Sequence, residues 1–173
     1  MNFKELIQIQ TEFNNTLSTV QTVEDYHFAL NVELAEFINT LPWKWWKKQQ
    51  TINKEKVLDE LADVMAFLFS VYDVHFNINV KNARIGDAQK ADIIKRAYDH
   101  LKDGFEFGLS TSPNIKKIQY WPMTEIPSLE SNGVRLGKLA KICISLTGCT
   151  VEDIVDAYKN KMQINHQRQK ENY

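Results

Sequence analysis

Two pairs of acidic residues constrain this chain more than any other feature of its sequence. Glu33 and Glu36 form the first pair and Glu60 and Asp63 the second, and the members of each pair are three positions apart. In an α-helix this spacing places both side chains of a pair on one face, about one turn apart. Core-forming apolar residues flank both pairs, namely Leu30, Leu34, Phe37 and Leu41, and then Leu58, Leu61, Val64, Met65, Phe67, Leu68 and Val71. The acids are therefore expected on helices that pack inside the molecule.

Four carboxylates on core-forming helices call for a cation. Burying ionised carboxylates side by side is costly unless their pKa values rise or a positive ion joins them. All four candidate ligands are oxygens and neither pair contains His or Cys, so Mg²⁺ or Mn²⁺ suits the site better than zinc or copper. Mg²⁺ also implies a phosphate partner. The alternative is that the acids are solvated faces of amphipathic helices, which the apolar neighbours argue against.

Composition limits the class of protein. A chain of 173 residues can form one domain with its own core. The formal net charge of −1 gives no bulk attraction to nucleic acid or an anionic membrane. Cys143 and Cys149 are too few for a metal knuckle or a disulfide framework. With no long apolar run, neither a signal peptide nor a membrane span is expected, and the predicted location is cytoplasmic.

Apolar periodicity and capping signals predict an all-α fold, a helical bundle. The expected helices are residues 3–18, from Thr22 or Glu24 to before Pro42, 54–72, 87 to about 101, 133–147, and a last helix that begins at a Thr150-x-x-Asp153 capping box. The third is apolar nearly all round from Leu58 onward and belongs at the centre. Residues 104–131 contain two glycines and three prolines, which predict a long irregular loop or insertion, either a lid or a partner surface.

Three further groups of residues could contact a ligand. Trp43, Trp46 and Lys47 lie in an aromatic and basic connector directly after the first acid pair; tryptophan can stack on a base or sugar and lysine can meet a phosphate. A core plug, a dimer contact or an interfacial anchor would explain the connector as well. Gln10 and Asn14 are one turn apart, so their amides could read a nucleobase edge, although such amides are more often plain surface residues.

The third group lies near the end of the chain. Lys161, Asn165 and Arg168 recur on one helical face, where two cations and an amide could meet phosphate oxygens and a base edge. Considered without the other motifs, these three residues would be interpreted as the solvent-exposed face of a C-terminal helix.

These motifs, in this order, resemble the dimeric all-α dUTPases of the wider all-α nucleoside-triphosphate pyrophosphatase group, which includes the MazG-like enzymes. The resemblance spans most of the chain, although residues 75–132 match weakly, and it points to the short bacterial or phage-type branch. It implies a single domain over residues 1–173 with a variable insertion at about 104–131, and a homodimer. It further implies hydrolysis of dUTP to dUMP and pyrophosphate, which limits uracil in DNA.

The resemblance also implies residue roles. Glu33, Glu36, Glu60 and Asp63 would hold Mg²⁺, and Glu33 or Glu36 would orient or deprotonate the attacking water. Asn165, with Gln10 and Asn14, would read the uracil edge. Lys161, Arg168 and Tyr173 would engage the phosphates, and Trp43 and Trp46 would form the pocket wall. The family usually has glycine before this tyrosine, where the chain has Asn172.

Three alternatives remain at this point. A MazG-like pyrophosphatase could act on another nucleotide such as dCTP. A phage dUTPase could also bind a repressor protein through residues 104–131, or the chain could be a helical interaction module of that kind. A di-iron bundle needs two Glu-x-x-His pairs, and only Glu24 and His27 have that spacing.

Overall fold

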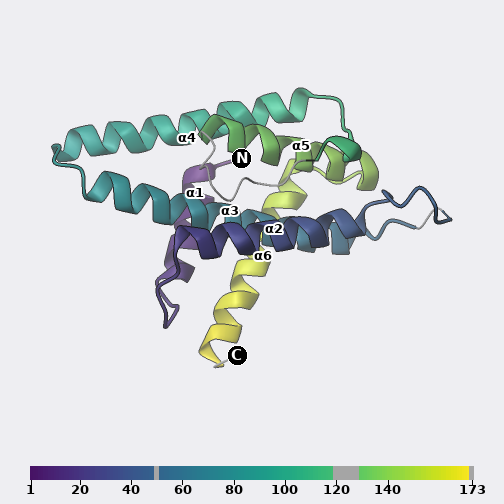
Figure 1. Ribbon diagram of the computed structural model, residues 1–173, viewed down its shortest axis with the longest axis horizontal. Helices are drawn as coiled ribbons and strands as arrows, with labels where there is room; N and C mark the ends of the chain where they lie inside the picture. Colours follow the sequence, from purple (N-terminus) through teal and green to yellow (C-terminus); the bar gives the residue numbers. More distant parts are fainter. Residues whose placement is uncertain (49–50, 119–128, 172–173) are drawn as a thin grey trace.

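The computed structural model describes residues 1–48, 51–118 and 129–171, and within these ranges it contains helices and no strand (Figure 1). The α-helices are α1 (Phe3–Asn14), α2 (Val23–Thr40), α3 (Lys54–Lys81), α4 (Asp87–Ser110), α5 (Leu129–Thr147) and α6 (Val151–Lys170), with a short 3₁₀ helix η1 (Ile115–Lys117) between α4 and α5. The all-α prediction is confirmed.

Helix α3 is the centre of the fold and contacts every other described α-helix. Leu61, Val64, Met65 and Leu68 on α3 are completely buried, as the nearly continuous apolar run predicted. Helices α2 and α3 lie side by side across the middle of the view, α4 and α5 lie above them, and α6 crosses below at a steep angle (Figure 1). None of the described helices combines the length and apolar character needed to cross a membrane.

Capping boxes begin the second and last helices where the sequence predicted. The Thr22 hydroxyl accepts from the Asp25 backbone N–H at 3.1 Å, and the Asp25 carboxylate accepts from the Thr22 N–H at 2.9 Å. Thr150 and Asp153 repeat this exchange at 3.1 and 3.0 Å. Each exchange satisfies two helix-end donors, which fixes the first turns of α2 and α6.

The prediction of an irregular segment over residues 104–131 was wrong at both ends. Helix α4 continues to Ser110 and α5 begins at Leu129. The middle of the predicted insertion, residues 119–128, lies outside the described residues. Other boundaries moved as well: α1 ends at Asn14 instead of 18, and α3 extends to Lys81 instead of 72.

The glycines that suggested a loop are instead the contact between α4 and α5. A Cβ at Gly104 would lie 2.2 Å from the Glu130 carbonyl oxygen, and one at Gly108 would lie 2.3 Å from that of Val134. Gly133 and Gly137 on α5 meet the α4 backbone equally closely. Glycine allows the two helix backbones to approach this closely because it has no side chain, so its role here is packing.

Candidate metal and nucleotide site

Three of the four acids predicted as metal ligands, two on α2 and one on α3, come together in the structure. Glu33, Glu36 and Glu60 each offer a carboxylate oxygen, and these oxygens lie within 4.8 Å of one another. The helix faces on either side are fixed by Leu34, Phe37 and Leu61, all completely buried. Because α2 and α3 pack side by side along these residues, the acids are held at a seam that the core itself aligns.

Burial and mutual repulsion disfavour the ionised form of this cluster. Burial raises the pKa of Glu33 to about 7, and the charges of Asp63, Glu36 and Glu60 add to the shift. Burial likewise raises the pKa of Glu60, and Glu36 adds to it. A divalent cation would reverse both effects by supplying positive charge among oxygen donors. The donor set fits Mg²⁺ or Mn²⁺, both of which prefer oxygen ligands.

The fourth acid, Asp63, is paired with a cation of the protein. Lys161 Nζ on α6 donates to Asp63 Oδ2 at 2.6 Å and to Asp59 Oδ1 at 2.9 Å. The Lys161 side chain is only 13% exposed. Burial raises the pKa of the Asp63 carboxyl, while the bond from Lys161 opposes that rise. Lys161 therefore provides local positive charge beside the acid cluster.

A polar cavity of about 400 Å³ opens beside Glu36 and Glu60. Its other lining residues are Asn39, Thr40, Thr51, Asn53 and Lys56. The sequence reasoning did not name Asn39 or Lys56. Both could have been found from helical spacing, because Asn39 follows Glu36 by three positions and Lys56 precedes Glu60 by four.

The amides predicted on α1 lie deeper than expected. Gln10 is 3% exposed and donates through Nε2 to Asn14 Oδ1 at 3.0 Å. Asn14 accepts a second bond from Ser70 Oγ on α3 at 3.2 Å. Ser70 follows Asp63 by two helical turns on the same face, a rise of about 10 Å. The amides therefore lie farther along the α3 face that carries the second acid pair.

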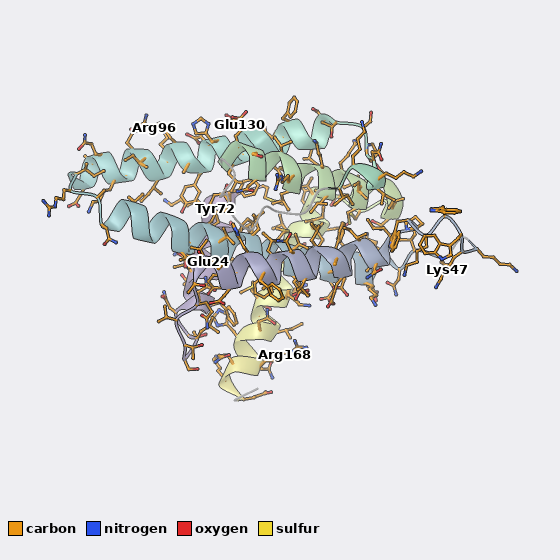
Figure 2. All side chains as sticks on the ribbon, in the orientation of Figure 1. Glu24, Lys47, Tyr72, Arg96, Glu130 and Arg168 are labelled. Atoms are coloured by element: carbon orange, nitrogen blue, oxygen red, sulfur yellow. The ribbon has the colours of Figure 1, made fainter. Side chains whose placement is uncertain are left out.

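The connector after α2 is built around tryptophan contacts. Trp43 and Trp46 meet edge to face at 5.4 Å between ring centroids, and Trp45 and Trp46 at 5.6 Å. Trp46 is 56% exposed, whereas Trp43 is half-buried with Nε1 lacking a hydrogen-bond partner among the described residues. Lys47 is exposed beyond the end of α2 (Figure 2). The connector offers aromatic faces close to the end of α2 that lines the cavity.

The remaining predicted contacts are on α6 or beyond it. Asn165 is half-buried, and Arg168 lies exposed on the part of α6 that extends below the bundle (Figure 2). Phe13 of α1 packs edge to face on His166 at 5.2 Å, which brings the end of α1 next to this part of α6. Tyr173 lies outside the described residues.

A bundle that holds several carboxylates along one helical seam, beside a polar cavity, defines an all-α protein suited to divalent cations. Within that class the chain belongs to the dUTPase family, whose sequence model matches residues 2–173. It is therefore a hydrolase of nucleotide metabolism, a dUTP diphosphatase. dUTPases generally use a divalent metal ion, and the glutamate cluster is present here. A search of curated proteins found no match to the chain.

Proposed function

We propose that the chain hydrolyses dUTP to dUMP and pyrophosphate with Mg²⁺ or Mn²⁺ held by Glu33, Glu36, Glu60 and Asp63. The observation that carries this proposal is the convergence of three glutamate oxygens within 4.8 Å. The reaction would remove a precursor of uracil in DNA and supply dUMP.

Each acid has a role that its position supports. The bound ion would neutralise phosphate oxygens and acidify water. Glu33 is half-buried whereas Glu36 is exposed, so Glu33 is better shielded to orient the attacking water and accept its proton. Asp63 forms an ion pair with Lys161. If the Asp63 side chain rotated toward a bound cation, the Lys161 ammonium would be free to contact a phosphate oxygen.

The rest of the nucleotide would extend away from the acids. Lys47, Lys161, Arg168 and Tyr173 are proposed for the phosphate chain. Trp43 and Trp46 are proposed for the pocket wall, and Gln10, Asn14 and Asn165 for the uracil edge. The separation of about 10 Å between Asp63 and Ser70 along α3 supports this division, because a nucleotide carries its base and its outer phosphates at opposite ends.

A substrate panel tests the proposed reaction. Purified protein is given dUTP, dCTP, dTTP or dATP, with Mg²⁺ or with EDTA, and pyrophosphate release is measured. We expect turnover of dUTP, dependence on Mg²⁺, and weaker hydrolysis of the other nucleotides. Preference for dCTP would favour the MazG-like alternative, and undiminished turnover in EDTA would contradict the metal site.

We also propose a homodimer in the cytoplasm. Phe28 and Val32 lie one turn apart on α2 and are 65% and 41% exposed, so a second copy could cover them. Light scattering during size-exclusion chromatography measures the mass, and a monomer at micromolar concentration would contradict the dimer.

Binding of a repressor protein through the predicted insertion remains an expectation, restricted to residues 111–128 because the flanks are helical. Deleting these residues should then abolish repressor binding while dUTP hydrolysis is retained.

A further inference from the structure

A chain of hydrogen bonds links α6, α1 and α3 beyond the acid cluster. Tyr158 is completely buried on α6, and its hydroxyl faces two acceptors at 3.1 Å, Gln10 Oε1 and the Leu6 carbonyl oxygen. Gln10 Nε2 donates to Asn14 Oδ1 at 3.0 Å. Asn14 Nδ2 donates in turn to Asp73 Oδ2 on α3 at 3.3 Å. The chain thus runs from a buried tyrosine to a half-buried carboxylate.

The carboxylate sets the direction of every bond in this chain. An ionised carboxylate can only accept hydrogen bonds, so Asn14 must present Nδ2, not Oδ1, to Asp73. Thr11 Oγ1 donates to the other oxygen, Asp73 Oδ1, at 2.8 Å, which holds the carboxylate in place. Asn14 Oδ1 then points inward, where Gln10 Nε2 donates to it at 3.0 Å. Ser70 Oγ lies 3.2 Å from the same oxygen and shares its one hydrogen between it and the Ala66 carbonyl oxygen, which is 3.0 Å away.

The direction of the chain determines which amide groups a ligand can meet. Both amide oxygens, of Gln10 and of Asn14, accept from donors within the protein. Each amide nitrogen carries two hydrogens, and each donates one of them within this chain. Asn14 is half-buried and Gln10 is buried. The group that the network offers outward is therefore an N–H donor, at Asn14.

We propose that Asp73 is a positioning residue for base selection. It turns the Asn14 amide so that an N–H faces the base, which favours the C4 carbonyl of uracil over the C4 amino group of cytosine. A donor that meets an amino group leaves both partners unsatisfied, and such a mismatch discriminates strongly in a shielded site. The proposal rests on the proposed function, in which Asn14 meets the uracil edge.

The Asp73→Asn variant tests this role. An asparagine at position 73 can donate, so Asn14 can turn its Oδ1 outward and accept from a cytosine amino group. We expect the ratio of kcat/KM for dUTP to kcat/KM for dCTP to fall by about tenfold or more. Asp103→Asn makes the same chemical change at an exposed position of α4 and should leave the ratio unchanged.

A structural role alone would give a different result. If Asp73 only fastened α1 to α3, Asp73→Asn would lower hydrolysis of both nucleotides together and keep their ratio, and the proposal would be overturned. Should circular dichroism show that this variant does not fold, Asn14→Ala removes the N–H that Asp73 is proposed to position and must lower the ratio in the same direction; an unchanged ratio overturns the proposal. A wild-type protein without dUTP preference would instead overturn the proposed function.

Discussion

Glu60 combines a fixed place on α3 with a charge that its surroundings disfavour. Burial and the charge of Glu36 raise its pKa, so an uncharged group of the same shape relieves repulsion. In Glu60→Gln we expect Mg²⁺-dependent turnover to fall by about a hundredfold or more, since one proposed metal ligand is lost. The melting temperature in EDTA should be equal to or above that of the wild type. Glu55→Gln, exposed on the same helix, should retain activity, and full activity in Glu60→Gln would remove Glu60 from the ligand set.

Lys161 bonds to two carboxylates of α3, Asp63 and Asp59. In Lys161→Met the Asp63 carboxylate, only 19% exposed, would lack this cation, and we expect a loss of about 1–3 kcal/mol in EDTA. Mg²⁺ should then stabilise the variant more than the wild type, because the ion replaces the missing charge. Thermal unfolding with and without Mg²⁺ measures the difference. Equal Mg²⁺ shifts in both proteins would show that Lys161 and the ion do not act on the same carboxylate.

Some of these residues could be read from the sequence and others could not. Glu33, Glu36 and Glu60 followed from local spacing on two helices, which any helical fold with this register preserves. The bond between Lys161 and Asp59 joins residues 102 positions apart, so it depends on how α6 crosses α3. Asp73 was missed for the same reason: its partners Thr11 and Asn14 lie on α1.

Helices α4 and α5 depend on glycine at their contact. In Gly137→Ala the new Cβ would lie 2.2 Å from the Phe105 carbonyl oxygen, so the helices must separate. We expect a destabilisation of about 1–3 kcal/mol in denaturant unfolding. Gly86→Ala is the matched control, since its Cβ would meet nothing within 4 Å. Equal effects of the two variants would contradict close packing at Gly137 as the cause of the destabilisation.

The start of helix α6 should respond to pH through Asp153. Its pKa is lowered by the hydrogen bond from the Thr150 backbone and by that from Lys54. A lowered folded-state pKa contributes stability above the ordinary value of 3.8, and this contribution is lost as the pH falls through the folded-state pKa. Asp153→Asn should therefore melt below the wild type at pH 7 and alongside it in strong acid. Asp156→Asn, exposed one turn later on α6, is the control for removing a negative charge from this helix, and a pH-independent difference for Asp153→Asn would contradict the assignment.

Helix boundaries show where sequence reasoning fails. The capped start of α6 was predicted because Thr150 and Asp153 carry the capping chemistry themselves, and Thr22 was one of two expected starts of α2. The end of α4 was missed because glycine in a sequence can mark a turn or a close helix contact. Only the packing of α5 against Gly104 and Gly108 shows that these glycines mark a close helix contact and not a turn.

The fold class followed from the sequence because periodic apolar faces are abundant and mutually consistent. The packing of α2 against α3 was expected because the acid pairs had to meet, whereas the crossing of α6 over α3 was not expected. The meeting of the acids has a consequence for the whole molecule, because the proposed ligands for one cation come from two helices, α2 and α3. An ion held between them should therefore stabilise the entire bundle, since it binds the folded chain and not the separated helices.

Titration with Mg²⁺ tests this coupling. At a free Mg²⁺ concentration a hundred times its Kd, the free energy of unfolding should rise by about 2.7 kcal/mol, and calorimetry should show a melting temperature that increases further with concentration. The formal net charge is only −1, so general screening is a poor alternative, and NaCl of equal ionic strength should give little shift. Glu36→Gln combined with Glu60→Gln removes one ligand from each helix and should abolish the Mg²⁺ response. A shift that persists in this double variant, or that NaCl reproduces, would mean that the cation does not join α2 to α3.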